Sequence, residues 1–135
     1  CAKFTAVNRR SKEIIPNNIL YTTKDGSDSL GLIAQNSILI PRQSPDNLEI
    51  DAAVIAQNGS AQRFYYSGNI LDTLIIFGSV VSNGIWTWSW VTQGGSVVSG
   101  YRNTITNYDA NLTYNPPPSF PVGTEYHVIS WKEIK

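Results

Sequence analysis

The four residues Ile33-Ala34-Gln35-Asn36 return letter for letter as Ile55-Ala56-Gln57-Asn58, 22 residues further along the chain. A looser third copy, Val80-Val81-Ser82-Asn83-Gly84, follows with its Asn-Gly pair displaced by 25 residues. Self-similarity at a period of this size is typical of solenoids, in which each repeat packs only on its neighbours. The echo therefore predicts a stack of coils.

Within each copy the local pattern is that of short strands. Residues 30–40, 48–66 and 73–91 are rich in β-branched and aromatic residues and are closed by Gly, Asn or Pro. No window of useful length places apolar residues at helical spacing, so helix should be nearly absent.

Two architectures are compatible with such strands. A parallel β-helix stacks equivalent residues of successive coils, whereas an antiparallel β-sandwich needs no sequence repeat, so the echo favours the β-helix. We therefore predict an all-β fold, a short parallel β-helix of about three coils with a C-terminal capping strand, and keep the antiparallel β-sandwich as the alternative. In this β-helix Ile33 should stack on Ile55 inside, and Asn36 should lie near Asn58 at a corner, where aligned amides hydrogen-bond along the axis.

A chain of 135 residues is expected to form a single domain over residues 1–135, with a sizeable core. Residues 1–29 should supply lead-in strands, with a turn at Asp25-Gly26-Ser27-Asp28, and residues 30–100 the solenoid coils. Residues 101–135 should form a proline-rich closing and capping segment that ends in a strand over residues 125–134.

Composition excludes several classes of partner. Ten basic and ten acidic residues cancel, so neither nucleic acid nor an anionic membrane is an expected partner. No apolar run approaches the ~20 residues that span a bilayer, so we expect no membrane contact by this chain itself. A polar surface with only 15% charged residues is common in extracellular β proteins.

No motif indicates catalysis. The single histidine, His127, has no nucleophile marked near it, and Cys1 is the only cysteine. Glu49 and Asp51 could point together as the carboxylate pair of a glycosidase does, but a solvated strand edge is the favoured interpretation. The turn at residues 25–28 lacks the remaining ligands of a calcium loop. We therefore expect no catalytic residue, no metal site, no cofactor and no enzyme.

The stretch Trp86-Thr87-Trp88-Ser89-Trp90 is the sharpest local feature. A continuous strand would send all three indoles to one face. They could pack as a secondary core, together with Trp131. Alternatively Trp86, Trp88 and Trp90, with Tyr65 and Tyr66 nearby, could form an aromatic platform that contacts sugar rings or a partner protein.

The tail adds a family resemblance to the repeated coils. Together with them, its segments resemble the C-terminal region of PilX-like type IV pilus assembly proteins over roughly residues 30–134; the segments are Tyr108-Asp109-Ala110-Asn111-Leu112, Pro116-Pro117-Pro118, Phe120-Pro121 and Trp131-Lys132-Glu133. These are bacterial surface proteins in which an N-terminal apolar helix precedes a β-solenoid-like exterior domain. The chain lacks that helix and looks like the exterior domain alone, from a protein that is membrane-anchored at full length.

The resemblance implies a noncatalytic accessory or minor pilin domain at the bacterial cell surface or in the periplasm. It would act in pilus assembly or surface attachment, through contacts with other pilus or cell-surface proteins. Two alternatives stay open: a carbohydrate-binding or polysaccharide-processing β-helix module with a glycan partner, and a self-assembling structural solenoid.

Overall fold

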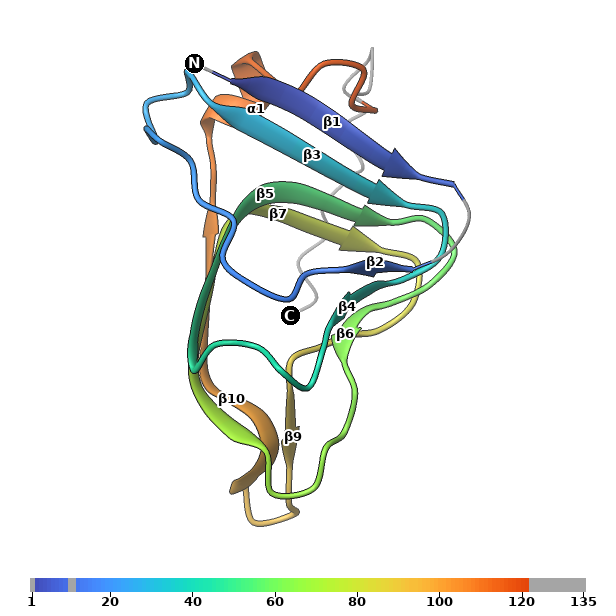
Figure 1. The fold of residues 1–135 in the computed structure, drawn as a ribbon, viewed down its shortest axis with the longest axis vertical. Coiled ribbons are helices and arrows are strands. Elements are labelled where there is room, and N and C mark those ends of the chain that lie inside the picture. The colour runs from blue at the N-terminus through green and yellow to red at the C-terminus, as the bar shows by residue number, and fades with distance from the viewer. Residues whose placement is uncertain (1, 10–11, 122–135) are drawn as a thin grey trace, which may run out of the picture.

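The computed structural model describes residues 2–9 and 12–121 and forms an all-β solenoid of about four turns (Figure 1). Its elements in chain order are β1 (Lys3–Asn8), β2 (Glu13–Ile14), β3 (Ser29–Ala34), β4 (Ile38–Ile40), β5 (Asn47–Ala56), β6 (Ala61–Arg63), β7 (Ile70–Ser82), β8 (Trp86–Thr87), β9 (Ser89–Val91), β10 (Val97–Tyr108) and α1 (Asn111–Tyr114). The four-residue α1 is the only helix among the described residues, as the missing helical spacing predicted.

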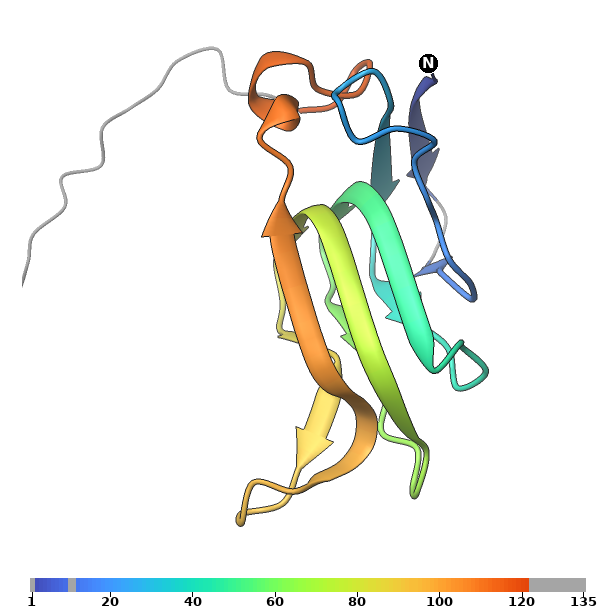
Figure 2. The same ribbon diagram turned by 90° about the vertical axis from the view of Figure 1, so that its left-hand side faces the viewer.

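Two sheets build the coils, and nearly all of their strands are parallel. The large sheet has the order β1-β3-β5-β7-β10-β9, and the small sheet has the order β2-β4-β6-β8. Figure 2 shows β5, β7 and β10 side by side in the large sheet. Of the strand pairs in the described residues, only that of β9 with β10 is antiparallel. The predicted parallel β-helix is confirmed, and the antiparallel sandwich is wrong.

The strand register pairs the echoed residues with each other, but Ile33 and Ile55 lie on the face opposite to the predicted one. Ile33 pairs with Ile55, and Ala34 pairs with Ala56. The interior cluster contains Leu32, Ala34 and Ala56 but not Ile33. Because side chains alternate along a strand, Ile33 and Ile55 lie on the outer face, so the prediction of an inward stack is wrong.

The third copy is aligned one residue differently from the sequence match. The register pairs Val81, not Val80, with Ile55. At the corner the structural alignment agrees with the sequence match again, because the Gly84 amide donates to the Gly59 carbonyl at 2.8 Å. The extra residue of the strand is therefore absorbed between the strand and the turn.

Both β5 and β7 bend sharply midway, so the large sheet supplies two walls of the solenoid (Figure 1). Gly78 lies at this bend with φ 146°, and a Cβ there would stand 2.0 Å from the Ala52 carbonyl oxygen. Only glycine allows the two backbones to approach this closely.

The corner asparagines do not form the predicted amide ladder. The side-chain amide of Asn58 donates to the Gln35 backbone carbonyl at 2.9 Å, while Asn36 Oδ1 accepts from Ser37 Oγ at 3.3 Å. Asn58 is thus tied to the neighbouring coil through a backbone carbonyl, whereas Asn36 bonds within its own corner.

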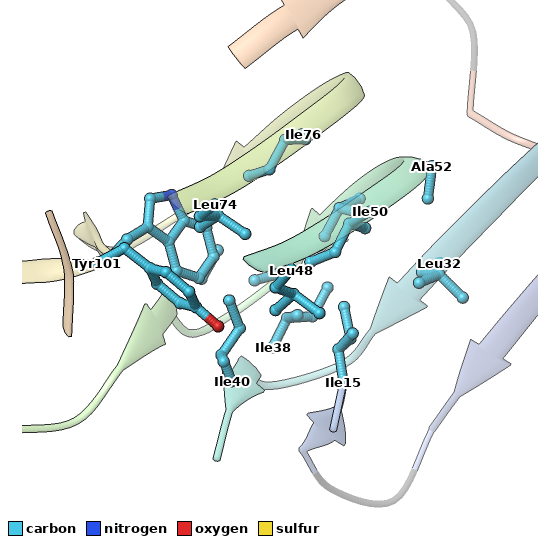
Figure 3. Close-up of a cluster of buried hydrophobic side chains, with 14 of the residues drawn as sticks. Ile15, Leu32, Ile38, Ile40, Leu48, Ile50, Ala52, Leu74, Ile76 and Tyr101 are labelled. Atoms are coloured by element: carbon cyan, nitrogen blue, oxygen red, sulfur yellow. The ribbon is translucent and has the colours of Figure 1, made fainter. Parts of the chain in front are cut away.

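The core is a single cluster of aliphatic side chains between the two sheets, with Tyr101 beside Ile40 and Leu74 at the side of the last coil (Figure 3). Ile15 belongs to this cluster, and β1 and β2 pair in parallel with β3 and β4. The expected lead-in strands therefore form a coil of their own, which is why the stack has about four turns and not three.

The described part of the closing segment lies along the flank of the first coils, not over the end of the last one. Thr5 Oγ1 donates to the Pro118 carbonyl, and Pro117 is buried. The Phe120 ring lies against Gly31, where an added Cβ would stand 2.5 Å from Cδ2. The capping strand predicted over residues 125–134 lies outside the described residues. No helix in the part of the chain described here is long and apolar enough to cross a membrane.

Candidate functional site

The tryptophan stretch is not one continuous strand. Trp86 belongs to β8 in the small sheet, the chain bends at Trp88, and Trp90 belongs to β9 in the large sheet. Trp88 is 5% exposed and joins the core, whereas Trp86 is 53% and Trp90 39% exposed. The prediction that all three indoles share one face is therefore wrong. Trp88 belongs to the core, whereas Trp86 and Trp90 are exposed to solvent.

Trp86 and Trp88 line a pocket on the last coil. It has a volume of ≈ 340 Å³ and is lined by Trp86, Thr87, Trp88, Ser89 and Thr104. The Trp86 and Trp88 ring centroids are 6.4 Å apart at an interplanar angle of 73°, an edge-to-face arrangement. The lining contains hydroxyl groups and indoles but no charged side chain.

Trp88 carries a buried donor that lacks a partner. The Nε1–H of Trp88 is buried and has no hydrogen-bond partner among the described residues. A buried donor left unpaired costs about 1–3 kcal/mol.

A second aromatic group surrounds Trp90. Its indole lies edge-to-face with Tyr65 at 6.1 Å, and its Nε1 donates to the Arg63 carbonyl at 3.1 Å. Tyr65 is 52% exposed. Trp90 and Tyr65 therefore form a surface pair that is fixed in position by the backbone.

Tyr66 has a structural role instead. Its ring lies 4.9 Å from the Arg63 guanidinium carbon, and its backbone amide donates to Ser99 Oγ at 2.9 Å. Arg63 is fully buried, and burial lowers the pKa of its guanidinium. Because Tyr66 is partly buried over this cation, it contributes less to a contact surface than Tyr65 does.

Glu49 and Asp51 point together on β5, but the favoured prediction of a solvated strand edge is wrong, because both bind the same lysine and the side chain of Asp51 is buried. Lys24 Nζ lies 2.5 Å from Glu49 Oε1 and 3.1 Å from Asp51 Oδ1. The hydrogen bond to Glu49 raises the pKa of Lys24. Asp51 is fully buried and also accepts from the Tyr21 amide at 2.9 Å. The pair holds the loop of residues 20–28 against the sheet, which is a structural task.

The part of the chain described here contains no group of three or more His, Cys, Asp or Glu side chains that could hold a metal ion. His127 and Trp131 lie outside the described residues. Thr104 could not be found from sequence patterns, because its place in the pocket depends on the pairing of β10 with β7.

The chain was compared with protein-family models, curated proteins and solved structures, and none of the three comparisons found a match.

Proposed function

We propose that this chain is a noncatalytic, extracytoplasmic recognition domain of a type IV pilus-associated protein, which acts in pilus assembly or surface attachment through protein contacts. One observation carries the proposal: Trp86, Trp90 and Tyr65 are between 39% and 53% exposed on a solenoid with few surface charges. Large aromatic side chains left in water mark interaction surfaces, because they bury much apolar area when a partner binds.

Two further features support the proposal. The solenoid carries the segments 108–112 and 116–118, on which the resemblance to accessory pilin exterior domains rests. Its net charge is zero, which disfavours nucleic acid and anionic membrane as partners. The partners we propose are other pilus or cell-surface proteins, at the bacterial cell surface or in the periplasm.

The test is a gene replacement in the bacterium that carries this gene. Cells producing the double variant Trp90→Ala/Tyr65→Ala should lose piliation or surface attachment while the protein level stays normal. Tyr114→Ala is the matched control, because Tyr114 is an exposed aromatic residue of α1, which lies beside the loop of residues 20–28 and away from β9 (Figure 1). A deletion strain with normal pili and normal attachment would overturn the proposal.

A second candidate, the binding of a neutral glycan, is favoured by the pocket of Trp86, Thr87, Trp88, Ser89 and Thr104. An indole offers a face for a sugar ring, and the hydroxyl groups of the lining are suited to bond its hydroxyls.

Calorimetric titration with neutral oligosaccharides, chosen by glycan array, tests this candidate. Trp86→Ala should weaken binding by tenfold or more, whereas Trp90→Ala, outside the pocket, should leave it unchanged. An absence of binding to every neutral glycan, or equal binding by both variants, would reject it. Trp88→Ala is unsuitable as a test because that indole is part of the core.

A further inference from the structure

Among the described residues, strand β10 has an open edge on the side away from β7. It pairs with β7 from Gly100 to Tyr108. On its other side β9 covers only Val97 to Gly100, and the Tyr101 amide donates to the Trp88 carbonyl at 3.2 Å. From residue 102 to residue 108, no strand among the described residues pairs with this edge. Such an edge is a template for a further strand.

The sequence along this edge is a palindrome. Asn103-Thr104-Ile105-Thr106-Asn107 reads the same in both directions. If two copies of β10 paired antiparallel about a two-fold axis at Ile105, every residue of the palindrome would face its own kind. Thr–Thr and aliphatic pairs directly opposite each other stabilise antiparallel ladders.

The open stretch and the palindrome have the same centre. The open edge runs from residue 102 to residue 108, so its midpoint is Ile105, the middle residue of the palindrome. The stretch is bounded on one side by Tyr101, which is bonded to Trp88, and on the other by Asp109, whose amide donates to the Gly78 carbonyl at 3.2 Å. An antiparallel copy in this register would use the whole open edge without displacing β9.

Charge does not oppose this pairing. Residues 102–108 contain one charged side chain, Arg102, and neither Pro nor Lys, the residues with which proteins commonly protect edge strands. In the two-fold register Arg102 of each copy lies opposite Tyr108 of the other, so the two cations stay at opposite ends of the ladder. The Ile105 side chains, 45% exposed on the outer face, would cover each other.

We propose that this domain forms a symmetric homodimer through antiparallel pairing of β10 with β10 of a second copy, centred on Ile105. The interface uses the same surface on both copies and is therefore closed. This distinguishes it from a head-to-tail polymer of solenoids, which would extend without limit. The dimer is independent of the proposed contacts of Trp90 and Tyr65, and it would present two copies of them.

Light scattering coupled to size-exclusion chromatography tests the dimer over a concentration series. The wild-type chain should approach twice its monomer mass of 14.9 kDa. Ile105→Lys should be monomeric, because two like charges would meet at the axis. Val81→Lys is the matched control: Val81 is a β-branched residue, 56% exposed on the same sheet, and its variant should stay dimeric.

Disulfide trapping tests the register in a Cys1→Ser background. Ile105→Cys should cross-link two copies on oxidation, because directly opposite residues have Cα separations of roughly 4.5–5.5 Å, within disulfide reach. Asn103→Cys should not, since the two 103 positions would be offset by four residues, roughly 13 Å. A wild-type monomer at all concentrations, a dimer that survives Ile105→Lys, or cross-linking at 103 instead of 105 would overturn the proposal.

Discussion

The first and last coils of the solenoid both expose apolar side chains, but only the first coils are covered by other segments of the chain. Over the first coils, the loop of residues 20–28 and the segment of residues 109–121 lie on the outside of the large sheet. The Asn115 side chain joins the two by donating to the Gly26 carbonyl at 3.0 Å. Over the last coil no described segment does this, and Trp86, Trp90 and Ile105 remain exposed.

This difference indicates that the covered first coils serve stability and the uncovered last coil serves recognition. A solenoid coil buries its inner face on its neighbours but has nothing to cover its open side. In the first coils the loop of residues 20–28, called the covering loop below, is held by two buried carboxylates. Asp28 and Asp51 accept hydrogen bonds from backbone amides. In the last coil Trp88 and Tyr101 fill the interior, and the remaining aromatic side chains are available to a partner.

The sharpest contrast lies within the last coil, between Trp88 and Trp86. Trp88→Ala should lower the free energy of unfolding by about 3–5 kcal/mol, because it removes a buried aromatic side chain and leaves a cavity. Trp86→Ala, at a half-exposed position, should cost only about 0.5 kcal/mol. Urea unfolding followed by circular dichroism measures both. Equal losses would mean that the two indoles are not divided between core and surface.

The hold on the covering loop should depend on Asp51. Asp51→Ala leaves the Tyr21 amide without its acceptor and removes one partner of Lys24, so a loss of about 1–3 kcal/mol is expected. Asp72→Ala removes an exposed carboxylate of β7 and should change stability by no more than about 0.5 kcal/mol. The same unfolding assay compares the two, and a null result for Asp51 would contradict a structural role for the buried carboxylate.

The covering segment should be anchored by Phe120. Phe120→Ala removes a half-buried ring from Gly31, so we expect a loss of about 1 kcal/mol, roughly half the value of a fully buried side chain. Hydrogen exchange of backbone amides gives the more specific readout. Amides of β1 and β3 should exchange faster in the variant while those of β10 keep the wild-type rate. Uniform acceleration over all strands would show that the ring stabilises the solenoid as a whole.

The sequence predicted the stacking of the coils but not which way their residues face. The echo aligned Ile33 with Ile55, and the parallel register followed from it. However, Leu32-Ile33-Ala34 and Val54-Ile55-Ala56 are apolar throughout, so alternation carried no signal for the inner face. Ile33 is buried on the outer face, where it lines a pocket together with Ser119 and Pro121, which are far away in the sequence.

The candidate site was predictable in its residues but not in its geometry. A period of two holds only while a strand continues, and the chain leaves the small sheet for the large one at Trp88. The sequence predicts lead-in strands, not a coil, for residues 1–29, because β1 and β2 carry no copy of the repeated tetrapeptide. Backbone pairing holds that coil in place, and pairing does not require repeated side chains.

The smallest effect we expect is a dependence of stability on pH, which comes from the covered side. Amide hydrogen bonds, first that of Ala2 at 2.7 Å and also those of Thr23 and Thr22, lower the pKa of Asp28 from its usual 3.8. A lowered folded pKa means that the stabilisation is complete above the unfolded pKa and disappears as the pH falls through the folded one. Wild-type stability should therefore decline below about pH 4, the region of an unperturbed carboxyl group.

Asp28→Asn should be less stable at neutral pH and should show a flatter acid decline. Asp72→Asn removes the same charge without touching these amides and should keep the wild-type decline. Denaturant midpoints from pH 7 downward measure all three chains; parallel curves for Asp28→Asn and the wild type would show that this carboxylate does not hold the loop.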